Sequence, residues 1–318
     1  MELKSDSRTV PSRVIVKLTV PPESDSETVN QDDPYEHVRE FHAYQLLPDL
    51  GVPTAAVYFK SMLKSGENAL IMEDLTLRAN LRGNDHKWSF DEARSILDFY
   101  VRLHLAGLRE SSCGDLRARW PWLSEHEGSQ LKAPMLSRML KKILASPVTG
   151  ARLSPHAGSL LSICDRMESL KKHLASRPQT FNYNDFFPGN VAVPDKWSPA
   201  DPAILFDWHL LGTGPVEQDL LNVFYGDHFS LINVDECLEH YISSINTAAG
   251  TSYKPGEVRN CMKAAELLGV MHSLWMLSGR LPAIELGKRK LPGWLDSLIT
   301  RIQNGYLDEL LSIAGRII

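Results

Sequence analysis

The stretch FNYNDFFPGN (181–190) decides how this sequence is interpreted. An aspartate, Asp185, and an amide, Asn190, lie five residues apart in a segment that is otherwise largely aromatic and apolar. A loop that only connects two elements would carry more polar residues and fewer aromatic ones. We therefore expect a loop that its aromatic side chains pack down, and whose two polar side chains are held in a fixed geometry.

Further polar groups of the same chemistry occur elsewhere in the chain. Asp207 ends an apolar run seventeen residues after Asn190, Lys17 lies in a strand-like segment, and Glu40 lies on the helix expected next. Phosphoryl transfer to a hydroxyl needs a carboxylate that accepts the proton, and an amide and a second carboxylate that hold Mg²⁺. It also needs a lysine for the phosphates and a glutamate that fixes this lysine. All of these residue types are present in the required chain order.

The first 75 residues are expected to be rich in strands. RVIVKLTV (13–20) alternates in polarity and contains many β-branched residues, which predicts a strand. The runs 55–62 and 68–74 flank a turn signal and predict a β-hairpin. A helix should begin near Asp33-Pro34, with aspartate as the N-cap, and run to about Leu47. Its apolar stripe is expected to consist of Val38, Phe41, Tyr44 and Leu47.

The rest of the chain is predicted to be mostly helical. Ser89 and Glu92 form a capping-box pattern in front of a long helix. Further helices are expected at 129–146, 155–175, 216–229, 234–249, 256–279 and 291–315. The fold class is therefore α+β with two lobes: a small β-rich N-terminal lobe (1–77) and a large helical C-terminal lobe (78–318) that carries the polar loop.

Composition and charge narrow the class of function. The chain of 318 residues has a net charge of −5 and a pI near 6.1, which gives no basic footprint for nucleic acid. No apolar run reaches membrane-spanning length, and the N-terminus has no apolar signal region. The four cysteines form no CxxC pair and predict free thiols in a reducing compartment. A cytoplasmic protein without nucleic-acid or membrane partners is the expectation.

These motifs resemble those of the aminoglycoside phosphotransferase and choline kinase superfamily, small-molecule kinases with a protein-kinase-like fold. NYNDFFPGNVAV (182–193) resembles the catalytic loop of the family, and ILFDWHLLGTGPVEQDL (204–220) resembles its metal-binding segment. REFHAYQLL (39–47) matches its Glu-x-x-x-Tyr helix. The resemblance spans about residues 13–225, and the C-terminal helices match only in general character.

The resemblance implies a reaction and a set of site residues. The γ-phosphoryl group of ATP would pass, with Mg²⁺, to a hydroxyl of a small molecule such as an aminoglycoside-like compound or an amino alcohol. The implied residues are Asp185 as catalytic base, Asn190 and Asp207 as Mg²⁺ ligands, Lys17 paired with Glu40, Asp219 as a support of the catalytic loop, and Met72, Glu73, Asp74 and Leu75 at the adenine.

Two positions depart from the family pattern. Tyr183 replaces the histidine of the catalytic loop, whose part is mainly structural and which an aromatic residue can replace. The family also places a phosphate-covering hairpin before its lysine strand, whereas sixteen residues precede Lys17 and the first glycine is Gly51. We therefore expect a shortened N-terminal sheet with an exposed edge near residues 14–20. Either the true start lies upstream, or the protein works without this hairpin.

Several residues have a plainer interpretation. Lys17 could face solvent, and Glu36 could be the partner of the lysine in place of Glu40. His104 is expected to be a buried, hydrogen-bonded histidine. Three tryptophans are expected in the core rather than in a cation-binding cage: Trp208, Trp275 and Trp294. Four acids could meet an amino sugar but are expected to be surface charges: Asp227, Asp235, Glu236 and Glu266.

Two alternative functions follow from the same residues. A non-catalytic pseudokinase that binds a ligand or a partner would explain the shortened N-terminal sheet, although the Asp185, Asn190 and Asp207 set argues against it. A protein kinase is disfavoured because no Ala-Pro-Glu motif and no evident activation loop follow Asp207.

Overall fold

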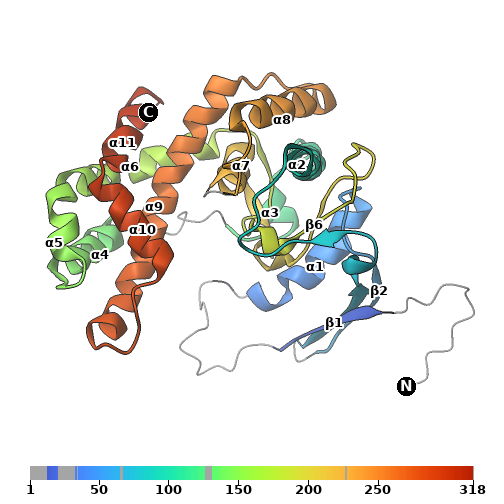
Figure 1. Cartoon of the computed structure of the whole chain (residues 1–318), viewed down its shortest axis with the longest axis horizontal. Coiled ribbons are helices and arrows are strands. Elements are labelled where there is room, and N and C mark those ends of the chain that lie inside the picture. The colour runs from blue at the N-terminus through green and yellow to red at the C-terminus, as the bar shows by residue number, and fades with distance from the viewer. Residues whose placement is uncertain are drawn as a thin grey trace, which may run out of the picture. The chain divides into compact units, whose positions relative to one another are not determined.

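The computed structural model of the chain describes residues 13–20, 33, 35–64, 67–125, 131–225 and 228–317. The chain divides into two compact units (Figure 1). The segments of the first unit are Met1–Ser124, Thr180–Thr213 and Asn222–Ser252, and those of the second are Glu125–Gln179, Gly214–Leu221 and Tyr253–Ile318. The lobe boundary expected near residue 77 lies inside the first unit and stays a prediction.

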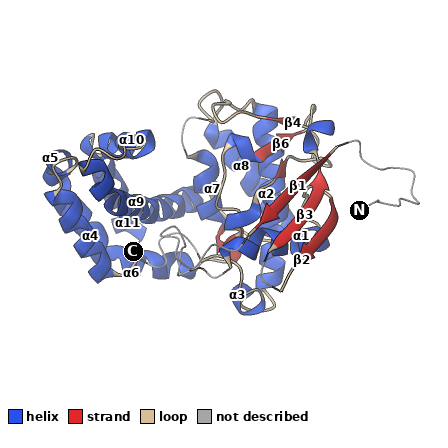
Figure 2. Cartoon of the chain, turned by 90° about the horizontal axis from the view of Figure 1, so that it is seen from below, coloured by secondary structure: helices blue, strands red, loops and turns tan. Residues whose placement is uncertain are grey.

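A three-stranded antiparallel sheet with the order β1–β3–β2 opens the first unit (Figure 2). Its strands are β1 (Val14–Thr19), β2 (Val57–Met62) and β3 (Asn68–Glu73), and β2 and β3 form the predicted hairpin. The register pairs Lys17 with Leu70. Because alternate residues face opposite sides of a sheet, Lys17 points to the same side as the buried Leu70 and Met72.

The other face of β1 is exposed. Val16, Leu18 and Val20 are 57%, 71% and 68% exposed. Among the described residues β1 pairs with β3 alone. The phosphate-covering hairpin of the family would fall on residues 1–12, which lie outside the described residues.

Helix α1 (Glu36–Asp49) packs against this sheet and buries the predicted stripe of Val38, Phe41, Tyr44 and Leu47. The predicted helix start is wrong by two residues, because the N-cap is Tyr35 and no side chain caps the helix. Asp33 is used differently: it accepts a hydrogen bond from the Tyr35 backbone N–H and pairs with Arg39. Pro34 lies outside the described residues.

The remaining elements of the first unit surround the predicted catalytic loop. Helix α2 (Phe90–Ser111) begins with the predicted capping box and packs along α8 (Val234–Ala249), and α3 (Leu116–Arg119) follows α2. Two small sheets frame the loop. Their strands are β4 (Asn80–Leu81), β6 (Val191–Val193) and β7 (Ile204–Leu205) in one, and β5 (Gln179–Asn182) and β8 (Gly212–Pro215) in the other.

The second unit is built from helices around one apolar core that includes Leu140, Met167 and Leu274. Its helices are α4 (Ala133–Ala145), α5 (Gly150–Leu153), α6 (Ala157–Ala175), α9 (Pro255–Glu285), α10 (Gly293–Gln303) and α11 (Tyr306–Ile317). The single helix predicted at 291–315 is wrong, because Gly305 with φ +88° separates α10 from α11. Helix α7 (Val216–Phe224) joins the two units and ends earlier than predicted.

Some expected positions of single residues are also wrong. Trp208 is fully buried as predicted, but Trp275 and Trp294 are 42% and 45% exposed, because α9 and α10 turn them away from the core. Glu266 was expected on the surface but is buried, and its carboxylate pairs with Lys263 and Arg301. Asp235 and Glu236 are exposed as expected, and Asp227 lies outside the described residues.

Two expectations from composition can be compared with the structure. All four cysteines are free thiols, as predicted. Within the part of the chain that the structure describes, every helix is too short or too polar to cross a membrane.

Substitution of Gly107 by alanine should destabilise the protein. The α2 backbone approaches β5 so closely there that an added Cβ would lie 2.2 Å from the Phe181 backbone N and the Thr180 hydroxyl. Overpacking of this kind costs about 1–3 kcal/mol, more than the gain of about 1 kcal/mol from alanine in a helix. The midpoint of thermal unfolding should therefore fall. Gly279→Ala is the matched control, since no atom lies within 4 Å of an added Cβ on α9 and this midpoint should rise slightly. A Gly107→Ala variant as stable as the parent would contradict the close packing.

Candidate active site

Lys17 connects strand β1 to two carboxylates. Its ammonium nitrogen lies 2.5 Å from Glu40 Oε2 on α1 and 2.8 Å from Asp207 Oδ1. The expected pairing with Glu40 is therefore present, and Glu36, the alternative partner, is exposed at the helix start. Burial opposes the charge of Lys17, but attraction to Glu40 and hydrogen bonds to both carboxylates outweigh it, and the pKa of the ammonium is raised. Burial raises the pKa of Glu40, and Lys17 offsets part of this rise.

Asp185 and Asn190 contact each other within the predicted catalytic loop. The Asn190 amide nitrogen donates to Asp185 Oδ2 at 2.8 Å and to the Asp185 backbone carbonyl at 3.2 Å. Both residues belong to the segment between β5 and β6, and Asn190 ends a short 3₁₀ turn, Pro188–Asn190. Below the loop, Phe186 packs on the buried rings of Trp88 and Tyr100. The aromatic residues thus hold the loop down, as the sequence indicates.

Tyr183, which replaces the family histidine, is fully buried. Its hydroxyl donates to the backbone carbonyl of Phe206, the residue before Asp207. Burial raises the pKa of Tyr183 well above its usual value, so the hydroxyl stays protonated and remains a donor. Tyr183 therefore links the catalytic loop to the segment that carries Asp207.

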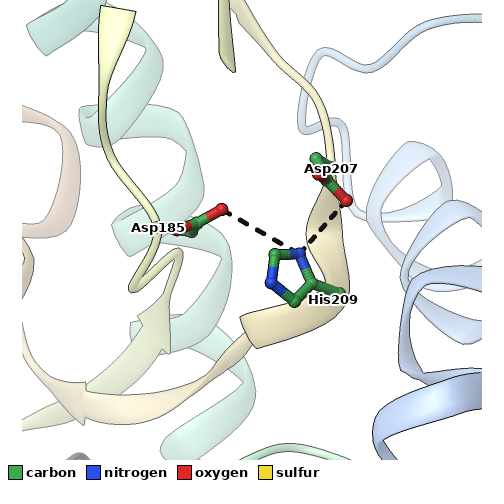
Figure 3. Close-up of side chains that lie close together, drawn as sticks. All are labelled: Asp185, Asp207 and His209. Atoms are coloured by element: carbon green, nitrogen blue, oxygen red, sulfur yellow. Dashed lines mark hydrogen bonds and ion pairs between the residues drawn. The ribbon is translucent and has the colours of Figure 1, made fainter. Parts of the chain in front are cut away.

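His209 also faces the site, although the sequence analysis did not single it out. Its Nδ1 lies 3.1 Å from Asp207 Oδ1 and 3.9 Å from Asp185 Oδ2 (Figure 3). The hydrogen bond from His209 is the largest cause that lowers the pKa of Asp207, and the same bond raises the pKa of His209. The signal in the sequence is the i, i+2 spacing of Asp207 and His209 in DWH. Asp185, Asp207 and His209 form a group with the residue types and spacing to hold a metal ion.

Two residues with left-handed backbone set the directions of these side chains. Asn184 has φ +64° and Asp207 has φ +65°. Asparagine and aspartate adopt this conformation more readily than other residues with a side chain, because their short polar groups can bond locally. The Asn184 amide donates to the carbonyls of Asn182 and Leu210. The chain is therefore turned sharply just before Asp185 and again at Asp207.

Arg39 fixes helix α1 to the segment after Asp207. Its guanidinium is buried, donates to the carbonyls of His209 at 2.7 Å and Trp122 at 2.8 Å, and pairs with Asp33. The helix that carries Glu40 is therefore held next to the segment that carries Asp207.

The other predicted site residues are placed as follows. Met72 and Leu75 are buried at the end of β3 and just after it, where adenine contacts are expected. The Glu73 backbone N–H is already used, because it donates to Ala56, and the Asp74 side chain accepts from Thr76. The adenine contacts and the support role of Asp219, which is fully buried in α7, stay predictions. His104 is buried and bonded to Tyr241 at 2.6 Å, as expected.

A comparison with protein families identifies the class of this chain. Residues 9–250 match the phosphotransferase enzyme family, and the chain therefore belongs to that family. No curated protein matches with significant similarity.

Solved structures confirm the predicted fold class, a kinase-like arrangement of small sheets and many helices. Choline kinase LicA from Streptococcus pneumoniae is 15% identical with a TM-score of 0.55, over 93% of this chain and 86% of that one. The GDP complex of aminoglycoside 2'-phosphotransferase-IIIa is 10% identical with a TM-score of 0.55, and the match covers 86% of this chain and 83% of that one. Plasmodium vivax ethanolamine kinase is 12% identical with a TM-score of 0.54, and the match covers 95% of this chain and 78% of that one. At these identities the likeness extends to the fold alone.

Replacement of Arg39 by methionine should strongly destabilise the first unit. The change keeps an apolar stem but leaves Asp33 and two carbonyls without their partner, and the loss of one member of a buried charge network costs about 3–5 kcal/mol. We expect a large fall in the midpoint of thermal unfolding. Arg119→Met is the control, because Arg119 forms an exposed pair with Glu110 at 2.5 Å and should cost less than about 1 kcal/mol. Equal effects of the two changes would show that Arg39 is not a structural clamp.

Proposed function

We propose that the protein is an ATP- and Mg²⁺-dependent kinase that transfers the γ-phosphoryl group to a hydroxyl of a small molecule in the cytoplasm. The observation that supports this most is the convergence, within one compact unit, of the Lys17–Glu40 pair, Asp207 and the hydrogen-bonded Asp185 and Asn190. These are the groups that phosphoryl transfer requires, and they come from four separate parts of the chain: β1, α1, the loop between β5 and β6, and the segment after β7. An aminoglycoside-like compound or an amino alcohol is the proposed class of acceptor.

Asp185 would orient the acceptor hydroxyl and take up its proton as the phosphoryl group is transferred. Its Oδ2 accepts from the Asn190 amide at 2.8 Å, which restrains the orientation of the carboxylate. Packing of Phe186 on the rings of Trp88 and Tyr100 would keep the loop in place as the hydroxyl approaches. The expected contribution of such a base is about 10²–10⁴-fold in rate.

Asp207 and Asn190 would hold Mg²⁺, because carboxylate and amide oxygens are the ligands that this ion prefers. Since the Asn190 nitrogen donates to Asp185, its amide oxygen is the atom that can face a cation. When bound, the ion would neutralise charge on the phosphates. Lys17 would bind the phosphates while Glu40 holds the ammonium at 2.5 Å.

The test begins with nucleotide binding and ends with the acceptor. The melting temperature of the full chain should rise with ATP more strongly in the presence of Mg²⁺ than in its absence, since a ligand that binds the folded state stabilises it. A screen for phosphorylated product over amino sugars, amino alcohols, nucleosides and macrolides would then identify the acceptor. Metal-dependent nucleotide binding without turnover on any of these would favour the pseudokinase alternative.

Asp185→Asn should lower turnover by about 10²–10⁴-fold, because the amide cannot accept the hydroxyl proton. The fold and the nucleotide affinity should stay close to those of the parent. Steady-state kinetics with the identified acceptor and calorimetry with ADP give the two values. Asp165→Asn, an exposed acid on α6, is the control and should be without effect. Turnover of Asp185→Asn within a few-fold of the parent would remove Asp185 from the mechanism.

Asp207→Ala should abolish Mg²⁺-dependent nucleotide binding, because it removes the carboxylate that supplies most of the ligand charge. Asn190→Ala should weaken this binding less, since an amide has no net charge. Calorimetric titration with a non-hydrolysable ATP analogue, with Mg²⁺ and with EDTA, measures both variants. If Asp207→Ala binds the magnesium complex as tightly as the parent does, the assignment of Asp207 is wrong.

A further inference from the structure

His209 places an imidazole next to two carboxylates, those of Asp185 and Asp207, and Asp207 also contacts the Lys17 ammonium. One ring nitrogen of His209 and one oxygen each of Asp207 and Asp185 all lie within 4.8 Å of one another, and Figure 3 shows the three side chains together. Neither the proton-accepting carboxylate nor the oxygen ligands of Mg²⁺ require an imidazole at this position. The side chain is 38% exposed, so the ring is accessible to an ion from solvent.

The segment around His209 is fixed by hydrogen bonds on both sides. Arg39 donates to the His209 carbonyl at 2.7 Å. The next carbonyl, of Leu210, accepts from the Ser124 hydroxyl at 3.0 Å and from the Asn184 amide at 3.1 Å. These bonds fix the backbone of the segment, and the hydrogen bond between Nδ1 and Asp207 orients the ring. His209 therefore belongs to the hydrogen-bonded structure of the site and is not an isolated surface histidine.

The distances indicate which carboxylate shares a cation with the imidazole. Metal–ligand bonds of about 2.1 Å in octahedral geometry separate adjacent ligand atoms by about 3.0 Å. The hydrogen-bond distance of 3.1 Å between His209 Nδ1 and Asp207 Oδ1 also fits this spacing, whereas the 3.9 Å to Asp185 Oδ2 is longer. The favoured pair of ligands is therefore Asp207 and His209, and Asp185 keeps its proposed role as the base.

We propose that His209 is a nitrogen ligand of the metal centre, so that the site binds a first-row transition-metal ion such as Mn²⁺ more tightly than Mg²⁺. This inference rests on the proposed function in one respect, the use of Asp207 as a metal ligand. Mg²⁺ prefers oxygen ligands alone, whereas imidazole suits transition metals, whose order of affinity increases from Mn²⁺ to Cu²⁺. One imidazole in place of an oxygen ligand therefore shifts the preference away from Mg²⁺.

The test uses the full chain, Mn²⁺ as the probe, and no acceptor. Loss of the free-ion signal in electron paramagnetic resonance gives the Mn²⁺ affinity, and competition gives that of Mg²⁺. Electron spin echo modulation of the bound ion, in protein with ¹⁴N- and then ¹⁵N-labelled histidine, reports a directly coordinated imidazole. We expect histidine nitrogen coupling in the parent protein, with an affinity for Mn²⁺ about ten-fold or more above that for Mg²⁺.

Variants assign the coupling to one ring. His209→Gln should lose the histidine coupling and about ten-fold or more of the Mn²⁺ affinity, with the Mg²⁺ affinity changed by less than about three-fold. His272→Gln, on α9 of the second unit, is the control and should keep both. The labelled parent needs no substitution, so the test does not depend on the folding of a variant.

Several results would overturn the proposal: no Mn²⁺ binding, no histidine coupling in the parent, coupling that persists in His209→Gln, or equal affinity for the two ions. The readout is separate from catalysis. Mg²⁺-dependent turnover without histidine coupling would reject this inference and keep the proposed function. Histidine coupling without turnover on any acceptor would keep this inference and reject the proposed function.

Discussion

The geometry of the site depends on the buried guanidinium of Arg39. A charge this deep in the protein is costly unless it is paired and hydrogen-bonded, and a guanidinium offers several donors in one rigid plane. Arg39 uses them on Asp33 and on the carbonyls of Trp122 and His209, and so joins segments that are far apart in the chain. The neighbouring residue on the same helix is Glu40. The contacts of Arg39 therefore set the position of Glu40, and with it the distance from Lys17 to Asp207.

Backbone strain at two positions completes this arrangement. A left-handed conformation costs about 1 kcal/mol or more for a residue with a side chain, and it persists only where surrounding contacts stabilise it. Asn184 meets this condition through its bonds to Asn182 and Leu210. At Asp207, the bond from Tyr183 to Phe206 fixes the residue before the turn. The two turns direct Asp185 and Asp207 toward His209, which one amphipathic element could not do.

Much of this structure could be predicted because it follows from local patterns. The stripe of α1, the capping box of α2 and the β2–β3 hairpin each have a sequence signal with a physical cause. Phosphoryl transfer also requires a lysine, a glutamate, two aspartates and an amide in a known order, so the types of the site residues could be predicted as well. Their roles stay predictions; the contacts that the structure shows are the pairs of Lys17 with Glu40 and Asp207 and the hydrogen bond from Asn190 to Asp185.

The features that could not be predicted depend on tertiary contacts. Glu266 looks like a surface acid until Arg301 and Lys263 surround it, and Asp33 looks like an N-cap until Arg39 takes its carboxylate. Apolarity alone predicts that Trp275 and Trp294 are core residues, yet the rotation of their helices leaves both partly exposed. His209 was missed for a similar reason, because its i, i+2 spacing from Asp207 is a weak signal until the structure shows the bond between the two side chains.

The charges of the site are consistent with the proposed divalent cation. Glu40, Asp185 and Asp207 contribute three negative charges, and Lys17 contributes one positive charge, which leaves two negative charges when His209 is neutral. Asp207 is the acceptor that Lys17 and His209 share, and their hydrogen bonds hold its pKa well below the usual range. A cation on Asp207 and His209 would take over this stabilisation of the carboxylate. Lys17 would then keep Glu40 as its partner, and its other N–H groups could bind the phosphates of the proposed nucleotide.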